Sequence, residues 1–569
     1  MTRRSFLNSM AALSVSAQLA AAPQPKPTRK PNIVFILTDD LGYMDVSSYA
    51  AHMRGVPRSD TYYETPYIDE LVDHGVAFSQ AYANQLCSPT RASLLTGRYH
   101  CRIGVTTAWL DNNLNYWNQG ETPPPGHHPL DSEHRDNITT QQALLNAKVL
   151  LGLPSGQPQD QGWNEICLPE VLKDYESTFI GKWHAGGAGA VGYQPMDQGF
   201  KVLAHYDSGG SPHFDWRRHW NPRDWKHWPT HKAVHDQPRN QGSFPGEPTS
   251  EYLTDCLTDL VVDYLADRAQ RPNEPFLLYF SHFIIHGPWQ AKQEDIDYFE
   301  KKPNRGWNNQ DDPVYAGMMK AMDDSVGRVI GALRANGQLE NTVIIFMSDN
   351  GGLGHRTSNA PLKAGKAFLY EGGVRVPLVC WWPGHIEGPA WCDVPVHCTD
   401  VFSTIADLAG ATVPHRVDGQ TLMPLLEDPK NRAGRYVRKP IYWHYPMNVG
   451  LNHPDTGLPL TPHSGMRKGD YKIIWDWHGK LELYNIAEDL SEEHDLSEQE
   501  PEHTRELFRE LVTWLDNNVE ARYFPKPNPD YQPEEDTRAY PFRDLRKELL
   551  GLTTPPGLPD AMGKNAGRP

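Results

Sequence analysis

The sequence lacks both a long hydrophobic run and an excess of basic residues. Its 569 residues include 54 Lys and Arg against 71 Asp and Glu, a formal net charge of −17 at pH 7. No apolar run approaches the roughly 18 residues that a helix needs to cross a bilayer, so no integral membrane segment is predicted. A general nucleic-acid binder needs a basic face for phosphates, and the acidic balance therefore predicts no nucleic-acid partner.

Cysteine is scarce as well, and its pattern excludes two kinds of site. The seven cysteines form no Cys-x-x-Cys pair of the type that holds zinc or performs redox chemistry. Their count is odd, and their spacing does not decide among the disulfide pairings that six of them would allow. A chain of this length buries a large core without relying on disulfides.

The N-terminal residues have the features of an export leader. Arg3 and Arg4 precede a modestly apolar segment that ends in three alanines at 20–22, as in a twin-arginine signal. We predict an export signal over residues 1–22, a proline-rich linker over 23–31, and a periplasmic or secreted location. The alternative is a disordered tail in which two arginines are adjacent by chance.

Alternating strand and helix patterns predict an α/β fold with a large mixed, mostly parallel sheet flanked by helices. Continuous aliphatic runs at 33–37, 276–280 and 343–347 are typical of strands buried on both faces. A shorter strand is expected at 178–180. Apolar residues at helical spacing follow at 254–269 and 315–336.

The pattern changes after about residue 435. Short β-like runs at 441–443, 471–474 and 481–484 precede an amphipathic helix at about 502–517, which predicts a smaller C-terminal domain of antiparallel sheet plus one helix. The predicted division of the chain is a large α/β domain at 32–434, the C-terminal subdomain at 435–525, and a proline-rich arm or tail at 526–569.

Polar side chains follow two of the predicted strands. Asp39 and Asp40 come after the first strand, and Asp349 and Asn350 come after the run at 343–347. Ligands of an open α/β sheet bind beyond the carboxyl ends of its strands. Carboxylate and amide oxygens suit Ca²⁺ or Mg²⁺ rather than a soft metal. Helix caps or turns are the alternative for either pair alone, and the shared position at strand ends favours a metal site.

Residues 87–98 read Cys-Ser-Pro-Thr-Arg-Ala-Ser-Leu-Leu-Thr-Gly-Arg. Pro89 suits a first helical turn and Gly97 a helix end, so Cys87 is expected at a helix N-terminus, where backbone N–H groups favour an anion. The run resembles the signature of the type I sulfatases, Cys-x-Pro-x-Arg followed by Leu-Thr-Gly-Arg. In that family the cysteine is oxidised to formylglycine, whose hydrated aldehyde is the nucleophile. The alternative is a buried cysteine that acts as a small apolar residue.

The resemblance runs from about residue 31 to residue 500. Further blocks that resemble the family lie at 31–45, 65–69, 181–184, 359–366, 371–377 and 467–472. The segments at roughly 105–165 and 205–250 are not covered. The family belongs to the alkaline phosphatase superfamily, and the fold that it implies agrees with the α/β pattern.

Carried over residue by residue, the resemblance implies a complete site. Arg91 would hold the formylglycine hydrate, and Lys182 and Lys366 would clamp the sulfate oxygens. His184 would contact the hydrate and take its second proton, while His286 would bind sulfate and protonate the leaving alcohol. The implied ligands of one Ca²⁺ or Mg²⁺ are Asp39, Asp40, Asp349, Asn350 and the modified Cys87. A formylglycine-generating or anaerobic sulfatase-maturating enzyme is implied as a partner.

One position leaves two candidates. Family members often have Pro before the histidine of the third site, whereas Ile285 precedes His286 here and His282 lies upstream. The Gly287-Pro288 pair that follows favours His286, and His282 remains the competitor.

The expected substrate is a sulfated carbohydrate. The segment at 205–235 carries Trp216, Trp220, Trp225 and Trp228 among histidines and arginines. Aromatic faces stack on sugar rings and arginines bind anions, but a loop whose aromatics pack onto the domain explains the composition equally well. Two other functions stay open: a catalytically silent binder of sulfated glycans, and a phosphate or phosphonate ester hydrolase of the same superfamily.

Overall fold

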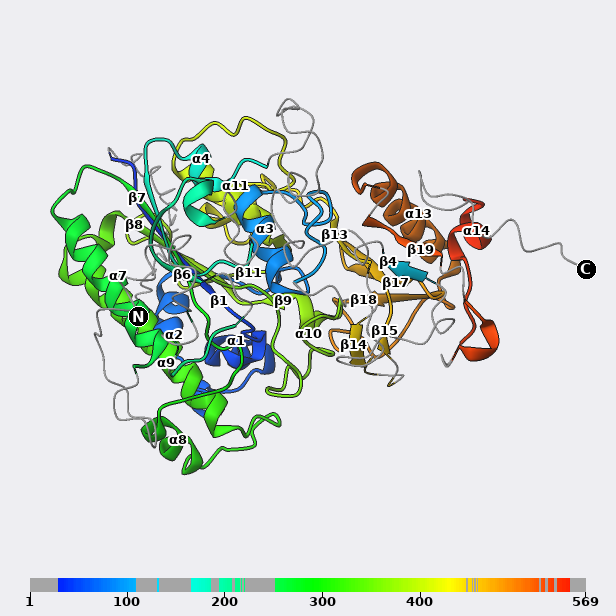
Figure 1. The fold of residues 1–569 in the computed structure, drawn as a ribbon, viewed down its shortest axis with the longest axis horizontal. Helices are drawn as coiled ribbons and strands as arrows, with labels where there is room; N and C mark the ends of the chain where they lie inside the picture. The colour runs from blue at the N-terminus through cyan, green and yellow to red at the C-terminus, as the bar shows by residue number, and fades with distance from the viewer. Residues whose placement is uncertain are drawn as a thin grey trace, which may run out of the picture.

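The structure is a computed structural model that describes residues 29–108, 130–132, 165–185, 194–206, 210–214, 216, 220, 251–446, 449–452, 454, 457, 459–520, 523–527, 531–536 and 540–552. A large α/β body lies beside a smaller C-terminal part (Figure 1). The predicted export signal, Trp225 and Trp228 lie outside the described residues.

An eight-stranded sheet forms the centre of the large body. Only β10 runs antiparallel to its neighbours, and the other pairs are parallel. This confirms the predicted mixed, mostly parallel sheet. The strands, in spatial order, are β11 (Ala390–Cys392), β2 (Val76–Phe78), β10 (Leu378–Trp381), β8 (Thr342–Ser348), β1 (Asn32–Thr38), β7 (Phe276–Ser281), β5 (Glu176–Lys182) and β6 (Lys201–Tyr206).

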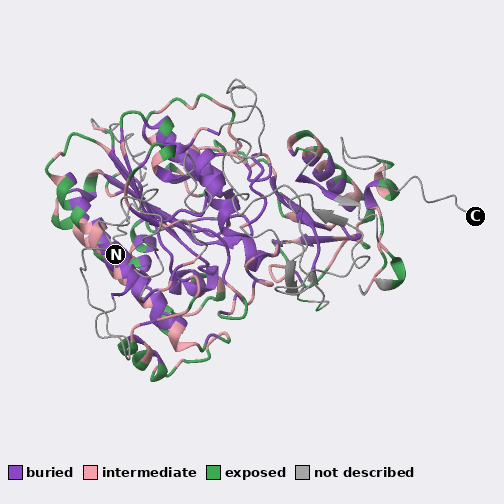
Figure 2. Ribbon diagram, in the orientation of Figure 1, coloured by how far each residue is buried: buried purple, intermediate pink, exposed green. Residues whose placement is uncertain are grey.

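Helices cover both faces of this sheet. Successive side chains of a strand point to opposite faces, and in these strands the side chains on both faces are apolar and need to be buried. Val34 and Ile36 of β1 pack in one core, and Ile33, Phe35 and Leu37 pack in the other. The first core includes residues of α1 (Ser47–Arg54), α2 (Pro66–His74), α7 (Leu253–Ala269), α8 (Gln293–Glu300) and α9 (Pro313–Ala335). The second includes residues of α3 (Cys87–Thr96), α4 (Leu168–Val171), α11 (Cys398–Leu408) and α12 (Met423–Glu427). Figure 2 shows these buried layers.

The ends of α9 illustrate how the sequence sets a helix. The Asp312 carboxylate accepts hydrogen bonds from the backbone N–H groups of Val314 and Tyr315, and Pro313 occupies the first turn. Gly337 follows the helix at φ 66°, a left-handed conformation that glycine adopts easily.

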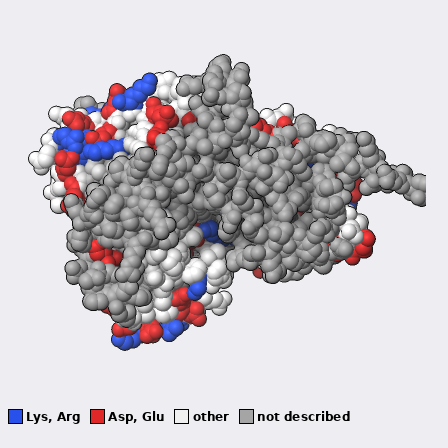
Figure 3. Space-filling view, viewed as in Figure 1, with Lys and Arg blue, Asp and Glu red and all other residues white. Residues whose placement is uncertain are grey.

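Over α8, acidic and basic side chains are interspersed on the surface (Figure 3).

The C-terminal part contains a four-stranded antiparallel sheet, β13 (Ile441–Tyr445), β16 (His463–Lys468), β17 (Tyr471–Asp476) and β18 (Lys480–Asn485). Helix α13 (Pro501–Asn518) packs Leu507, Phe508 and Leu511 against it. The smaller antiparallel sheet and its helix were predicted. The central strand β16 was not recognised, because Gly465 and polar residues interrupt its hydrophobic pattern.

Residues after 526 continue along this sheet as far as they are described. The imidazole of His478 lies 3.2 Å from the Asp536 carboxylate, and α14 (Leu545–Leu550) buries Leu545 in the core of the C-terminal part. The remaining elements are short: β3 (Ala81–Tyr82), β9 (Arg375–Val376), β12 (Val396–His397), β4 (Leu130–Ser132), β14 (Val449–Asn452), β15 (Pro459–Leu460), β19 (Pro525–Pro527), α10 (Glu371–Val374) and the 3₁₀ turns at 43–45, 58–60, 195–198, 339–341 and 533–535.

A group of buried charges, here called the junction cluster, joins the two parts. It consists of Glu371 and Arg375 from the large body and Lys472 and Glu492 from the C-terminal part. Lys472 Nζ lies 3.0 Å from Glu371 Oε1 and 2.9 Å from Glu492 Oε1. Arg375 Nη1 lies 3.1 Å from Glu371 Oε2, which also accepts a hydrogen bond from the Tyr82 hydroxyl at 2.9 Å.

Two tryptophans of the 205–235 segment serve packing. Trp216 and Trp220 are each 1% exposed and belong to the core of the large body. Their faces are covered by protein, so the interpretation of these two as sugar-stacking residues is wrong. The tight packing of large rings against the domain explains their abundance.

Two further findings concern the described residues. No helix among them is long and apolar enough to cross a membrane. All seven cysteines lie in the described ranges, and each is buried and outside any disulfide.

Candidate active site

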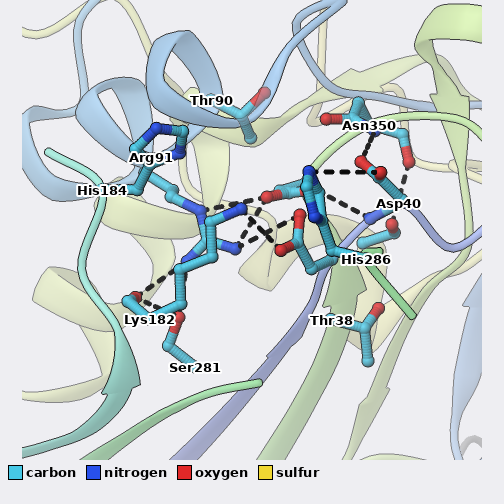
Figure 4. Close-up of polar contacts among 12 residues, drawn as sticks. Thr38, Asp40, Thr90, Arg91, Lys182, His184, Ser281, His286 and Asn350 are labelled. Atoms are coloured by element: carbon cyan, nitrogen blue, oxygen red, sulfur yellow. Dashed lines mark hydrogen bonds and ion pairs between the residues drawn. The ribbon is translucent and has the colours of Figure 1, made fainter. Parts of the chain in front are cut away.

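Four neighbouring strands end at the same level of the sheet. Thr38 of β1 pairs with Ser348 of β8, and Leu37 pairs with Ser281 of β7. Ser281 in turn pairs with Gly181 of β5. The residues that follow these strands therefore meet at one edge (Figure 4). These residues are Asp39, Asp40, Asp349, Asn350, His286 and His184, and Lys182, the last residue of β5, lies at the same edge.

Helix α3 brings Cys87 and Arg91 to this edge. Cys87 is the first residue of the helix and is 2% exposed, as its sequence predicted. Arg91 lies one turn later on the same face. Gly97 ends the helix at φ 69°, where a β-carbon would come within 2.6 Å of the Phe402 ring. The glycine thus permits both the left-handed turn and the close approach of α11.

The Arg91 guanidinium ties three segments together. Its Nε and Nη2 donate to Asp349 Oδ2 at 3.0 and 2.7 Å. Its Nη1 donates to the Lys182 carbonyl at 2.9 Å and to the Ser281 hydroxyl at 2.5 Å. A planar guanidinium presents five N–H donors in a fixed fork, so this pattern fixes the side chain in one orientation.

Two lysines bring positive charge to the carboxylates. Lys182 Nζ lies 2.5 Å from Asp39 Oδ2, and Lys366 Nζ lies 2.6 Å from Asp40 Oδ1. Lys366 arrives on the long loop after β8, and its backbone N–H donates to the Gly352 carbonyl at 3.0 Å. The six residues Asp39, Asp40, Arg91, Lys182, Asp349 and Lys366 are called the active-site cluster below.

The structure distinguishes between the two candidate histidines by position. His286 Nε2 lies 3.8 Å from Asp40 Oδ2, and its Nδ1 contacts the Gly287 carbonyl at 2.8 Å. Since a carbonyl only accepts, Nδ1 carries the proton of the neutral ring. His282 instead packs its ring 3.9 Å from the Phe280 ring and is buried. The geometry places His286, and not His282, at the active-site cluster.

His184 approaches from the end of β5. Its backbone has φ 48°, and its carbonyl accepts a hydrogen bond from the Ser88 hydroxyl at 2.7 Å. A non-glycine residue in the left-handed region is held there by its surroundings, and such residues are common at functional sites. Asp40 shares this feature, at φ 61°.

Burial and mutual repulsion set the protonation of the site. Burial, together with the negative charge of Asp39, raises the pKa of Asp349 to about 6, and burial also raises the pKa of Asp39. Burial acts on Asp40 in the same direction, but Lys366 and His286 outweigh it and hold the pKa of Asp40 below its usual value. Burial and the charge of Lys366 lower the pKa of His286 to about 4. The crowded carboxylates would be relieved by a cation.

The donor set fits a hard cation. Asp39 Oδ1 and Asn350 Oδ1 are buried at the site without a hydrogen-bond partner among the described residues. One ligand atom each of Asp39, Cys87 and Asp349 lie within 4.8 Å of one another. Unpaired buried oxygens are costly unless something binds them, and oxygen ligands suit Ca²⁺ or Mg²⁺.

The sequence prediction missed two residues that shape the site. The Ser281 hydroxyl accepts from Arg91 and donates to the Lys182 carbonyl at 2.7 Å, and Ser88 holds the carbonyl of His184. Ser281 had a usable signal: like Asp39 and Asp349, it is a polar residue directly at the end of a buried aliphatic strand. Ser88 had none beyond its place beside Cys87.

The chain matches two family models. The model described as Sulfatase matches residues 31–411. The model described as N-sulphoglucosamine sulphohydrolase, C-terminal, matches residues 364–520. The two matches together span both the active-site cluster and the C-terminal sheet.

Individual relatives are similar over most of their length. A sulfatase of Formosa agariphila is 29% identical over 549 residues, covering 89% of this chain and 92% of the relative. The N-acetylgalactosamine-6-sulfatase of Mus musculus is 30% identical over 516 residues, covering 88% and 81%. The crystal structure of Ps i-CgsB in complex with k-i-k-neocarrahexaose has 29% identity and a TM-score of 0.62, covering 87% of this chain and 95% of that one.

Proposed function

The chain belongs to the sulfatase family of sulfuric ester hydrolases, in the alkaline phosphatase superfamily, and we propose that it hydrolyses sulfate esters of a saccharide with a formylglycine made from Cys87 and a bound Ca²⁺. One observation carries the proposal. Cys87 at the N-terminus of α3 lies beside Asp39 and Asp349, and these carboxylates and Asp40 are paired with three cationic side chains at the carboxyl edge of the sheet. The names of the relatives support a saccharide substrate, since one acts on N-acetylgalactosamine-6-sulfate and one structure holds a neocarrahexaose.

Cys87 is the residue that a maturating enzyme would convert. A hydrated aldehyde at position 87 would supply one hydroxyl as the nucleophile that displaces the alcohol from sulfur, and a second whose deprotonation would re-form the aldehyde as sulfate leaves. A thiol or a serine has no second hydroxyl, so neither could complete the cycle in this way. The buried setting of Cys87 keeps bulk water away from the reacting group.

The cationic side chains have distinct tasks in this proposal. Arg91, fixed by Asp349 and Ser281, orients the group at position 87 from the same helix face. The ammonium groups of Lys182 and Lys366 each have three N–H donors. One contacts an aspartate, so the other donors remain for sulfate oxygens. Positive charge fixed in place before the reaction stabilises the negative charge that shifts among those oxygens.

The two histidines move protons. His184 is buried beside Lys182, and burial with the nearby positive charges holds its pKa well below the usual value, so the ring is neutral and can take a proton. His286 is partly exposed, with 27% of its side chain accessible, and faces Asp40. We assign it to the leaving alcohol, and the charge of a bound sulfate ester would favour its protonated form.

A cation would be held by Asp39, Asp40, Asp349, Asn350 and the modified residue 87. When bound, Ca²⁺ supplies Lewis-acid polarisation of the oxygens that it contacts and neutralises the clustered carboxylates. Mg²⁺ is the alternative, and the two are separated by metal analysis of the purified protein. The unpartnered oxygens of Asp39 and Asn350 support this assignment.

Export completes the proposal. The paired arginines at 3–4 and the alanines at 20–22 support a twin-arginine signal, with a periplasmic or secreted mature protein. Fractionation of expressing cells tests this: Arg3→Lys together with Arg4→Lys should leave the protein inside the cytoplasm. Export of that variant at the wild-type rate would contradict the assignment.

The activity is tested with purified protein co-expressed with a maturating enzyme. Sulfate release is measured from sulfated mono-, oligo- and polysaccharides, beside phosphate release from matched phosphate esters. Cys87→Ala should abolish sulfate release, whereas Cys380→Ala, which removes an equally buried thiol from β10, should retain it per folded molecule. Sulfate release by Cys87→Ala at the wild-type rate, or a preference for phosphate esters, would refute the proposal.

A further inference from the structure

A cavity of about 600 Å³ adjoins the active-site cluster and shares Lys366 with it. Most of its wall is the loop at 353–368, and Asn309, Asp311 and Pro454 complete the lining. This volume lies within the range of pockets that hold small organic ligands and exceeds what one sulfate group needs. The cavity therefore offers room for the part of a substrate that does not react.

Arg356 is the one arginine of this loop, and it lines the cavity together with Lys366. Its guanidinium carbon lies 3.8 Å from the centre of the Trp289 ring, and 38% of its side chain is exposed. Its ion-pair contact with Asp312 Oδ2 is 3.7 Å long, beyond hydrogen-bond distance. Stacking on an aromatic face holds a guanidinium in place while its in-plane N–H groups stay available for an anion.

The loop that carries Arg356 is fixed before any ligand binds. Thr357 donates its hydroxyl to Asp45 Oδ1 at 2.5 Å, and Gln310 Nε2 donates to the Ser358 carbonyl at 3.2 Å. Asn359 Nδ2 donates to the carbonyls of Gly352 and Ala364 at 3.0 Å each. The last two bonds close the loop between Asn350 and Lys366. A side chain held this way loses little entropy on binding.

Arg356 also links the two catalytic loops. Its loop follows Asp349 and Asn350 of the candidate metal site, while Trp289 follows His286 after a Gly-Pro pair. The remaining lining is mixed: Asp311 and Asn309 can bind hydroxyl groups, and Phe368 presents an apolar face. Hydroxyl-binding groups, an apolar face and a guanidinium whose only ion-pair contact among the described residues is 3.7 Å long together match an anionic sugar.

Resting on the saccharide sulfatase activity proposed above, we propose that this cavity is a subsite in which Arg356 binds a second anionic group, sulfate or carboxylate, of the saccharide whose ester reacts beside Lys366. Binding energy from that remote group would orient the ester, so it should appear in kcat/KM. A substrate with a single charged group, such as an aryl sulfate, would gain nothing from it.

Binding is measured by calorimetry in the Cys87→Ala background, so that no turnover interferes. The ligands are carrageenan hexasaccharides, which carry sulfate alone, and heparin hexasaccharides, which carry sulfate and carboxylate, each beside its chemically desulfated form. Arg356→Gln should weaken the tightest of the four complexes by about tenfold. Arg356→Lys keeps the positive charge but lacks the planar fork of N–H donors. Its affinity should lie between that of the parent and that of Arg356→Gln. Loss of affinity for desulfated heparin would identify carboxylate as the second anion.

The matched control is Arg435→Gln, because Arg435 is also exposed and pairs with Glu427 at 2.7 Å, yet does not line the cavity. This variant should bind as the parent does. Unchanged affinity in Arg356→Gln, equal losses in both variants, or no binding of any of the four saccharides overturns the subsite. If binding depends on Arg356 but the wild-type protein releases no sulfate, the subsite stands and the proposed activity fails.

Discussion

Two groups of buried charges lie at either end of the segment from Asp349 to Arg375, and they are built differently. In the junction cluster every carboxylate oxygen of Glu371 and Glu492 lies within 3.1 Å of a nitrogen or hydroxyl group, and Glu492 Oε1 contacts Lys472 at 2.9 Å as an ion pair without hydrogen-bond geometry. In the active-site cluster, Asp39 Oδ1 has no hydrogen-bond partner among the described residues, and neither has the neighbouring amide oxygen of Asn350. A cluster whose carboxylate oxygens each contact a cation or a donor within 3.1 Å stabilises a fold, whereas Asp39 Oδ1 lies 3.9 Å from Arg91 Nη2 and is open to a ligand.

The largest expected effect comes from breaking the active-site cluster at Asp349. Asp349→Asn keeps the shape but removes a negative charge that faces both Arg91 and the candidate metal site. Sulfate release should fall by at least about 10³-fold, or about 4 kcal/mol of transition-state stabilisation. Bound Ca²⁺, measured by mass spectrometry of the metal content, should fall with it. Wild-type kcat/KM with full metal content in this variant would contradict the assignment.

Breaking the junction cluster should act on stability instead. Glu371→Gln leaves Lys472 and Arg375 with one fewer buried counter-charge, which should lower the free energy of unfolding by about 3 kcal/mol. Urea denaturation measures this. Glu427→Gln, which breaks an exposed ion pair with Arg435, is the matched control and should cost less than about 1 kcal/mol. A loss of activity in folded Glu371→Gln protein that matches the loss in Asp349→Asn would remove the distinction between the two clusters.

Removal of the cation should affect the active-site cluster and leave the junction cluster unchanged. Chelation should abolish sulfate release and lower Tm, and added Ca²⁺ should restore both, because a ligand present at about 100 times its Kd stabilises the folded state by about 2.7 kcal/mol. The same increment is expected in Glu371→Gln, since its junction cluster shares no partner with the metal site. Full activity after exhaustive dialysis against chelator would show that no metal is needed.

The smallest contrast is between the two histidines. His286→Gln removes a proton donor from the site and should lower kcat by about 10²-fold or more with little change in Tm. His282→Gln replaces a planar ring packed on Phe280 by a flexible amide in a buried site and should lower Tm, while kcat per folded molecule stays near that of the wild type. Sulfate release and thermal unfolding of the two variants decide this. The reverse pattern would make His282 the functional residue.

The sequence predicted those parts of the fold and of the site that depend on residues adjacent in the chain. Continuous aliphatic runs marked β1, β7 and β8, and polar residues at their ends marked the carboxyl edge, so Asp39 and Asp349 could be found without coordinates. The Cys87 segment carried both a helix signal and a family resemblance. These features depend on neighbours in the chain.

Long-range packing decided what the sequence did not predict. Strand β16 lies between β13 and β17 because they supply its hydrogen bonds, although its own residues alternate poorly. The burial of Trp220 depends on rings from other segments, Tyr206 and Phe283, and Trp216 packs against Trp220 in turn. The stacking of Arg356 on Trp289 joins loops that are far apart in the chain, and no periodicity marks such a contact.

The most direct measurement is the mass of the peptide that contains Cys87, taken from preparations whose specific activity on a sulfated saccharide is known. The account predicts that the fraction of this peptide with an aldehyde in place of the thiol rises in proportion to activity as co-expression of the maturating enzyme is increased. A fully active preparation in which Cys87 is found only as an unmodified thiol would contradict it.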